Sequence, residues 1–236
     1  MHVLKSNKEQ ITLKYGKQNV GGAIYNHKGI DIVKKTNKLD YIIAAQNGKV
    51  IKIVSNVKKR DPSKGLGNYV ELLHGDNIKT RYCHLKYGSI KVKVGQIVNK
   101  GQVLGYMGDT GYTFGAHLHF EVLVNNKNVN PLPYLEDKKK IPPYVEYKTG
   151  EYIVLASVLT VRKGPGTSYG FIRYKDLTKN AKEQMAKLTK KKVNGYVKGM
   201  EFTASKIESK TNENWAKTPS GWVAINQGNN VYCKMI

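Results

Sequence analysis

The stretch GAHLHFEV, residues 115–122, places His117 and His119 one residue apart in an otherwise apolar run. Successive side chains of a β-strand point to opposite faces, so residues i and i+2 share a face. If this run is a strand, the two imidazoles stand side by side. Such a pair suits a metal ligand next to a second polar group, but it equally suits two half-buried histidines bonded to their neighbours.

A third histidine, His27, is followed in the sequence by a nearby carboxylate. His27 lies in NHKGID with Asp31 four residues later, and Gly29 permits a tight loop that turns both side chains toward one centre. Together with one histidine of the strand pair they would make three protein ligands with an open fourth position, as in hydrolytic zinc sites. The remaining histidines, among them His84 in RYCHL, suit proton transfer because the unperturbed pKa of imidazole lies near neutral. No HExxH occurs, which excludes the helical zinc site with a glutamate base.

Other histidines and the cysteines are expected to be structural. His74 precedes a Gly-Asp turn, where a local hydrogen bond is the usual need, and His2 lies at a terminus. Cys83 is a strand neighbour of His84 and should point to the opposite face, into the core. Cys83 and Cys233 form no CxxC pair, so neither a cysteine zinc site nor a disulfide framework is expected.

The composition favours an all-β, mainly antiparallel protein. The chain has 236 residues, 40% of them hydrophobic, with 23 glycines, 16 tyrosines and many short runs of Val and Ile. No long amphipathic helix is visible in residues 10–134. Strand pairs are predicted around Asn47-Gly48 and around Gly75-Asp76.

The formal charge of +23 predicts an anionic partner. Only four of the 40 basic residues are arginine, the side chain that bidentate phosphate and base-edge recognition prefers. The lysines are spread along the whole chain. We therefore expect diffuse attraction to a polyanion and no specific nucleic-acid binding.

Residues from about 10 to 134 resemble the lysostaphin-type zinc metallopeptidases, which cut the peptide part of bacterial peptidoglycan. The family signature, His-x-x-x-Asp followed later by His-x-His, occurs as His27 to Asp31 and as His117-Leu-His119. Further matching pieces in the same order are AAQNGKV, GLGNYVELLHGD, RYCHL and VKVGQIVNKGQVLGYMGDTG.

The resemblance implies a role for each of these residues. His27, Asp31 and His119 would bind Zn²⁺, while His84 and His117 would be the two catalytic histidines. One of those two would act as general base and the other would support the tetrahedral intermediate, with the assignment left open. The bond cut would lie in the stem peptide or in the cross-bridge.

Tyr112, in the glycine-rich loop before the HLH strand, resembles a substrate-binding tyrosine that faces the groove of the family. It could equally be an aromatic that only packs the loop.

The chain is predicted to divide into a zinc metallopeptidase domain at 1–135, a linker at 136–148 and a second domain at 149–236. The linker sequence is rich in lysine and contains Pro142-Pro143, although a long surface loop within one domain is the alternative. The second domain resembles a small bacterial SH3-like β barrel that binds cell walls, through ASVLTVRKGPGTSYGFI and NWAKTPSGWVAI.

Two features of this second domain carry expectations of their own. A short helical insertion is predicted within 176–192. Core packing is expected for Trp222, and exposed tyrosines are candidates for a ligand groove: Tyr152, Tyr169, Tyr174 and Tyr196.

The sequence thus predicts a monomeric zinc endopeptidase held on peptidoglycan, and partly on anionic wall polymers, by its second domain. No signal peptide and no membrane span are visible, as expected for a phage endolysin made in the host cytoplasm and then released to the wall. The alternatives are a secreted autolysin whose leader has been removed, a catalytically silent peptidoglycan-binding protein, or a basic nucleic-acid binder.

Overall fold

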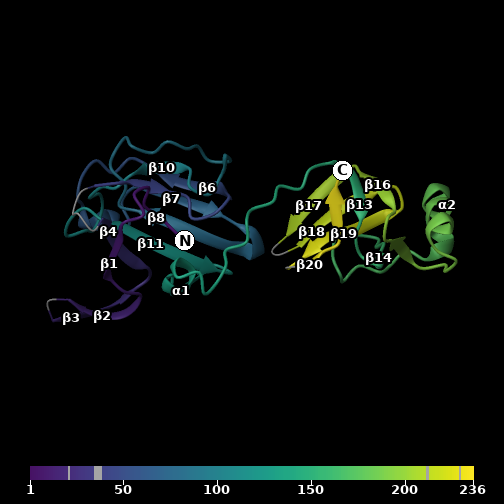
Figure 1. The fold of residues 1–236 in the computed structure, drawn as a ribbon, viewed down its shortest axis with the longest axis horizontal. Helices are drawn as coiled ribbons and strands as arrows, with labels where there is room; N and C mark the ends of the chain where they lie inside the picture. The colour runs from purple at the N-terminus through teal and green to yellow at the C-terminus, as the bar shows by residue number, and fades with distance from the viewer. Residues whose placement is uncertain (21, 35–38, 211–212, 229) are drawn as a thin grey trace. The chain divides into compact units, whose positions relative to one another are not determined.

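Strands dominate the computed structural model of the protein (Figure 1). It describes residues 1–20, 22–34, 39–210, 213–228 and 230–236. Every ladder between its strands is antiparallel, which confirms the predicted class. The chain forms two compact units, Met1–Val145 and Glu146–Ile236. No helix in the described ranges is long and apolar enough to cross a membrane.

The main sheet of the first unit holds Asp31 and His119 among the residues predicted to do chemistry, and His84 and His117 directly adjoin its strands. In the described part of the chain it has eight strands, in the order β1-β4-β11-β8-β7-β6-β9, with β12 added to β11. The strands are β1 Glu9–Leu13, β4 Ile30–Lys34, β6 Gly48–Val54, β7 Tyr69–Leu73, β8 Ile78–Cys83, β9 Ile97–Val98, β11 Leu118–Val124 and β12 Lys127–Val129.

Smaller elements flank this sheet. They are the pair β2 Gly16–Val20 and β3 Ala23–His27, the pair β5 Tyr41–Ile43 and β10 Val103–Tyr106, helix α1 Leu132–Leu135, and 3₁₀ turns at Pro62–Lys64 and Gly75–Asn77.

One of the two predicted strand pairs is correct. β7 and β8 pair across the turn at Gly75-Asp76. The pair predicted around Asn47-Gly48 is wrong, because β5 pairs with β10, whereas β6 pairs with β7 and β9. The carbonyl of Asn47 accepts hydrogen bonds from His74 and Tyr144, so distant contacts hold this turn and not a local hairpin.

One face of β11 packs into the hydrophobic core of the first unit. Leu118, Phe120 and Val122 are completely buried in its hydrophobic cluster. Burial of such side chains contributes about 1.5–3 kcal/mol each. The alternate residues His119 and Glu121 point to the other face and are also buried. A strand fixed by its apolar face therefore presents its polar face in a defined position.

Part of the segment predicted to be a solvated linker, 136–148, packs on the first unit. Ile141 is only 5% exposed and belongs to the core cluster. The carbonyl of Pro142 accepts a hydrogen bond from Gly75 N–H at 3.0 Å, and Tyr144 N–H donates to the carbonyl of Asn47 at 3.0 Å. The boundary between the units lies after residue 145.

The second unit contains three small sheets and one helix among its described residues. The sheets have the orders β16-β13-β21, β14-β15 and β17-β18-β19-β20. The elements are β13 Gly150–Val154, β14 Val158–Thr160, a 3₁₀ turn Tyr174–Asp176, α2 Lys179–Leu188, β15 Gly195–Val197, β16 Glu201–Ala204, β17 Lys206–Lys210, β18 Glu213–Thr218, β19 Gly221–Gln227, β20 Asn230–Val231 and β21 Cys233–Met235.

Helix α2 lies in the stretch where the sequence predicts one. The side chain of Thr178 caps it by accepting a hydrogen bond from Ala181 N–H, and Ala181 and Met185 form its buried face.

The aromatic residues of the second unit divide between core and surface. Trp222 packs in the core as predicted, together with Trp215. Tyr152 and Tyr196 are buried at 1% and 2% exposure, so the expectation that they are exposed is wrong. Tyr169 is 46% exposed.

Candidate metal centre

Three atoms from separate elements of the first unit converge on one point. His27 Nε2 lies 3.1 Å from Oδ1 of Asp31 and 2.9 Å from Nδ1 of His119. The same Asp31 oxygen lies 2.9 Å from His119 Nδ1. In the described part of the chain, no other group of three or more His, Cys, Asp or Glu side chains is arranged to share a metal ion.

Strand pairing positions these side chains. His27 ends β3, Asp31 lies in β4 and His119 lies in β11. Asp31 and His119 are direct partners across the β4–β11 ladder. Gly29, between the first two ligands, passes so close to β11 that a Cβ atom would lie 2.9 Å from the His119 ring. The glycine thus leaves room for the imidazole of His119, in addition to permitting the loop.

The outer nitrogens of both imidazoles are held by protein oxygens. His27 donates from Nδ1 to the Lys14 carbonyl at 2.9 Å, and His119 donates from Nε2 to Glu121 Oε1 at 3.2 Å. A neutral imidazole carries one N–H, so the inner nitrogens present lone pairs. Two lone pairs and a carboxylate oxygen at these distances repel each other unless a proton or a metal cation lies among them. Two imidazoles and one carboxylate form a donor set that suits zinc.

The electrostatics also favour a cation. Burial raises the pKa of Asp31, but hydrogen bonds with His119 and His27 outweigh it and hold that pKa well below its usual range. Burial lowers the pKa of His119, but hydrogen bonds to Asp31 and Glu121 outweigh it and raise the pKa to about 9. Without a metal, His119 therefore carries a second proton at neutral pH. A metal ion that binds there displaces this proton.

Sequence reasoning missed a chain of buried charges behind His119. Glu121 is 1% exposed and accepts a hydrogen bond of 2.6 Å from Arg81 Nη1. Arg81 also donates from Nε to Glu71 at 2.7 Å. A carboxylate bonded to the outer nitrogen of a metal-binding histidine orients the ring and makes it a better ligand. The signal was present in the sequence, because Glu121 continues the i, i+2 spacing of the histidine pair.

The two remaining histidines predicted to be catalytic lie beside this centre. His84 donates from Nδ1 to the Thr110 carbonyl at 2.7 Å, and His117 donates from Nδ1 to the Gly115 carbonyl at 2.8 Å. Their ring centroids are 4.8 Å apart. His117 Nε2 lies 3.6 Å from Asp31 Oδ1. Burial, together with the charge of His117, lowers the pKa of His84 to about 4, so its imidazole is neutral at neutral pH and can accept a proton.

His84 has an unusual backbone conformation. The sequence suggested a strand residue, but His84 follows the end of β8 and has a φ of 61°. A non-glycine residue in this left-handed region carries strain, which often accompanies functional positions. Its N–H donates to the Leu66 carbonyl at 3.1 Å, so the neighbouring loop holds this turn of the chain.

Tyr112 lies in the loop before β11 and is 56% exposed. Its ring meets Phe114 edge to face, at a centroid distance of 5.5 Å, and Phe114 is 80% exposed. On β3, the exposed ring of Tyr25 lies 5.9 Å from that of His27, between ring centroids. Sequence reasoning named Tyr112 but missed Phe114 and Tyr25.

The other histidines lie outside the centre. His74 is buried, donates from Nδ1 to the Asn47 carbonyl at 2.9 Å and accepts from Thr80 Oγ1 at 2.8 Å. His2 is exposed and contacts Glu9. Cys83 is completely buried as a free thiol, and this burial raises its pKa.

Part of the first unit is similar to proteins of a known family. Residues 25–131 match the model of peptidase family M23. This part of the chain is therefore similar to the M23 peptidases, a family of metallopeptidases.

Two curated relatives and one solved structure illustrate the match. The peptidoglycan DD-endopeptidase ShyB of Vibrio cholerae is 39% identical over 116 residues, which are 49% of this chain and 25% of that protein. The murein hydrolase activator NlpD of Escherichia coli is 35% identical over 118 residues, 50% of this chain and 28% of that protein. The catalytic domain of lysostaphin from Staphylococcus simulans is 28% identical, with a TM-score of 0.45, over 55% of this chain and 94% of that one. The chain thus spans about a quarter of the length of these two curated relatives.

Proposed function

We propose that the protein is a zinc-dependent endopeptidase that cleaves peptide bonds in bacterial peptidoglycan. One observation carries the proposal: His27, Asp31 and His119 present two lone pairs and a carboxylate oxygen to one point within 3.1 Å of each other. These residues would hold the metal. When bound there, zinc would polarise the scissile carbonyl and lower the pKa of water.

The protein's own groups would supply the proton chemistry. His84 and His117 each use Nδ1 for a backbone carbonyl, which leaves Nε2 available to the substrate. One of them would take the proton of the attacking water. The other would donate a hydrogen bond to the oxygen that becomes negatively charged in the tetrahedral intermediate.

The proposed substrate is the peptide part of the wall, either the stem peptide or the cross-bridge. The similarity to proteins named peptidoglycan DD-endopeptidases supports this class. We propose that Tyr112 contacts the substrate, because it is exposed on the loop that leads to His117.

We further propose that the second unit binds the wall as an SH3-like domain and holds the peptidase unit, as a monomer, on an insoluble substrate. Attachment to the wall raises the effective concentration of the peptidase there. The +23 charge would add attraction to anionic wall polymers. This layout suits a phage endolysin, and a secreted autolysin of the same chemistry would act at the same place.

A catalytically silent peptidoglycan-binding protein is the second candidate. The similarity to murein hydrolase activators favours it. The proposed ligands and both flanking histidines are present and adjacent in this chain, which favours catalysis.

The decisive experiment measures bound zinc and the free amines released from purified peptidoglycan, with and without a chelator. One zinc per chain with chelator-sensitive amine release is the expected result. Bound zinc without release from walls of several cross-link types would favour the silent protein, and absence of bound zinc would contradict the proposed centre.

A further inference from the structure

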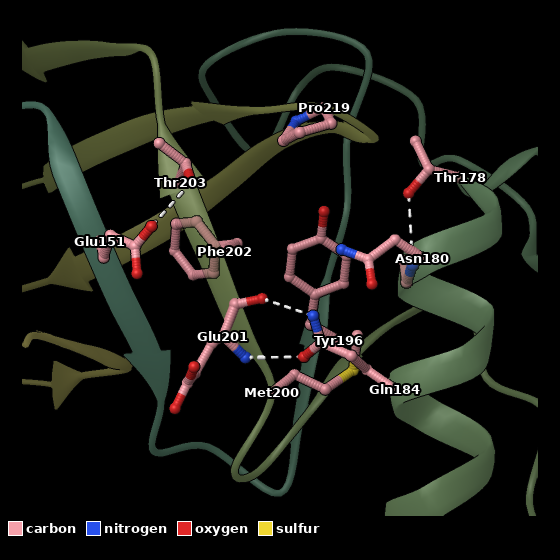
Figure 2. Close-up of a pocket in the computed structure, with 11 residues that line it drawn as sticks. Glu151, Thr178, Asn180, Gln184, Tyr196, Met200, Glu201, Phe202, Thr203 and Pro219 are labelled. Carbon is pink, nitrogen blue, oxygen red and sulfur yellow. Dashed lines mark hydrogen bonds between the residues drawn. The ribbon is translucent and has the colours of Figure 1, made fainter.

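A pocket of about 340 Å³ opens in the second unit between helix α2 and strand β16 (Figure 2). Its size lies within the range of about 300–1,000 Å³ that is usual for ligand sites. The apolar residues Tyr196, Met200 and Phe202 line its inner wall and are themselves 1–7% exposed. The phenol of Tyr196 is held by Thr218 Oγ1 at 2.8 Å, so the ring has a fixed position.

One wall of the pocket is the edge of a sheet. β16 is the outer strand in the order β16-β13-β21. The backbone N–H and carbonyl of Glu201 point away from β13. The N–H donates to Gln184 Oε1 at 2.9 Å, and the carbonyl accepts from Gln184 Nε2 at 3.1 Å. The amide of Gln184 therefore occupies the place of a neighbouring strand, as the dashed lines in Figure 2 show.

The next outward position on this edge is open. Backbone groups of an antiparallel strand point alternately toward and away from the partner strand, so Thr203 faces outward like Glu201. Further along, Ser205 N–H donates to the Lys217 carbonyl. Within the described residues, nothing bonds to the N–H or carbonyl of Thr203 on this outward side. An open pair of this kind accepts one residue of an added extended chain.

The pocket is acidic in a strongly basic chain. Its lining contains Glu151 and Glu201 but no lysine or arginine, although the chain has 40 basic residues. In the part of the chain that the structure describes, neither glutamate has an ion-pair partner. The carboxylate of Glu151 accepts one hydrogen bond, from Thr203 Oγ1 at 3.4 Å. Glu151 lies directly opposite Thr203 in the ladder, and Glu201 lies two residues before Thr203 on β16, so the three side chains share one face of the sheet.

We propose that this pocket binds a short extended peptide that carries a free ammonium group. The peptide backbone would pair with the N–H and carbonyl of Thr203, and the ammonium group would bond to Glu151 and Glu201. Its small side chains would lie against Tyr196. The inference rests on the proposed function only for the source of the ligand, which would be the free amino end of an uncross-linked or newly cut wall peptide.

The test titrates the full chain with trialanine that carries a fluorophore at its carboxyl end, and follows fluorescence anisotropy. A chelator is present throughout to prevent cleavage. The free-amine peptide should bind about tenfold more tightly than its N-acetylated form, because a charged hydrogen-bonded pair is lost on acetylation. Equal binding of the two peptides would overturn the inference.

Variants then locate the binding. Glu151→Gln with Glu201→Gln keeps side-chain size and should remove the tenfold preference for the free amine. The matched control, Glu208→Gln with Glu213→Gln on β17 and β18, removes the same charge outside the pocket and should retain it. Should the pocket variant bind like the wild type, the site would be elsewhere.

The edge pairing has its own test. Thr203→Pro removes the outward N–H at a position where an edge strand tolerates proline, and should weaken both peptides. Slower amide hydrogen exchange of Thr203 on addition of the free-amine peptide gives the same information without a variant. Unchanged exchange would contradict pairing at this edge. Amine release from walls, measured without chelator on the same variants, separates this inference from the proposed function, because either can fail while the other holds.

Discussion

At the scale of residues, each histidine of the candidate centre uses one ring nitrogen for a hydrogen bond. That bond decides what its second ring nitrogen can do. All four histidines at the candidate centre donate one N–H to a protein oxygen and keep the second nitrogen for chemistry. Three of the acceptors are backbone carbonyls and the fourth is a carboxylate. The pairs are His27 with Lys14, His84 with Thr110, His117 with Gly115, and His119 with Glu121.

Substitution of His117 and of His119 should separate zinc binding from catalytic turnover. His119→Ala removes a proposed ligand and should abolish stoichiometric zinc and activity together. His117→Ala should retain zinc but lose about 10²–10⁴-fold in turnover, the usual contribution of a general acid–base group. Zinc analysis and amine release measure both effects, with His2→Ala as the control. Normal zinc and normal lysis in both variants would show that the site is misassigned.

The carboxylate behind His119 should affect zinc affinity. Glu121→Gln weakens the hydrogen bond that orients the ring and removes one partner of Arg81, so affinity should fall about 10–100-fold. Competition with a chromophoric chelator measures it. Glu136→Gln, an exposed change of the same charge on the same unit, should have no effect. Unchanged affinity in the Glu121 variant would mean that the carboxylate does not act on the metal site.

At the scale of elements, buried polar contacts hold the turns that connect the central strands. His74, between β7 and β8, bonds to the Asn47 carbonyl and to Thr80. The ring fits because Gly48 has no side chain, and a Cβ there would lie 2.9 Å from it. This histidine, far from the candidate centre, therefore ties β6 to the β7–β8 pair.

His74 should make the stability of the first unit depend on pH. Burial lowers its pKa to about 4 in the folded state, against about 6.5 when unfolded. The unfolded state therefore binds the proton first as pH falls. Stability is complete above pH 6.5 and lost progressively toward pH 4, by about 2–3 kcal/mol for this group at pH 4.5.

The variant His74→Gln cannot titrate at this position. The stability advantage of the wild type over the variant should therefore shrink by about 2–3 kcal/mol between pH 7 and pH 4.5. Urea unfolding, followed by NMR signals of β7 and β8, measures the difference. Parallel pH curves for the two proteins would show that His74 does not cause the effect.

At the scale of the whole molecule, the chain divides into two units, each with its own core. The composition of 136–148 suggests that the whole segment is solvated. Instead, the packing of Ile141 and the bonds of Pro142 and Tyr144 assign its first part to the first unit.

A chain that ends at Val145 should be more stable than one that ends at Leu135. The shorter chain loses the burial of Ile141, worth about 1.5–3 kcal/mol, and two backbone hydrogen bonds of about 0.5–1.5 kcal/mol each. A difference of about 2.5–6 kcal/mol is therefore expected in urea unfolding. Equal stability would show that residues 136–145 do not belong to the folded unit.

The sequence by itself determined the features that depend on residue type and short spacing. Strand alternation placed His117 and His119 on one face, and the motif His27 to Asp31 supplied the remaining proposed ligands. The all-β class and the α2 helix also followed from local patterns. Such patterns act over a few residues and need no knowledge of the fold.

The tertiary structure decided everything that depends on partners distant in sequence. The pairing of β5 with β10, the Arg81 contact to Glu121, the burial of Tyr152 and Tyr196, and the position of Ile141 are examples. Local alternation states which face a side chain occupies but not which strand lies opposite. The choice of strand follows from burying the largest apolar surface while every buried polar group finds a partner, and this is a property of the whole chain.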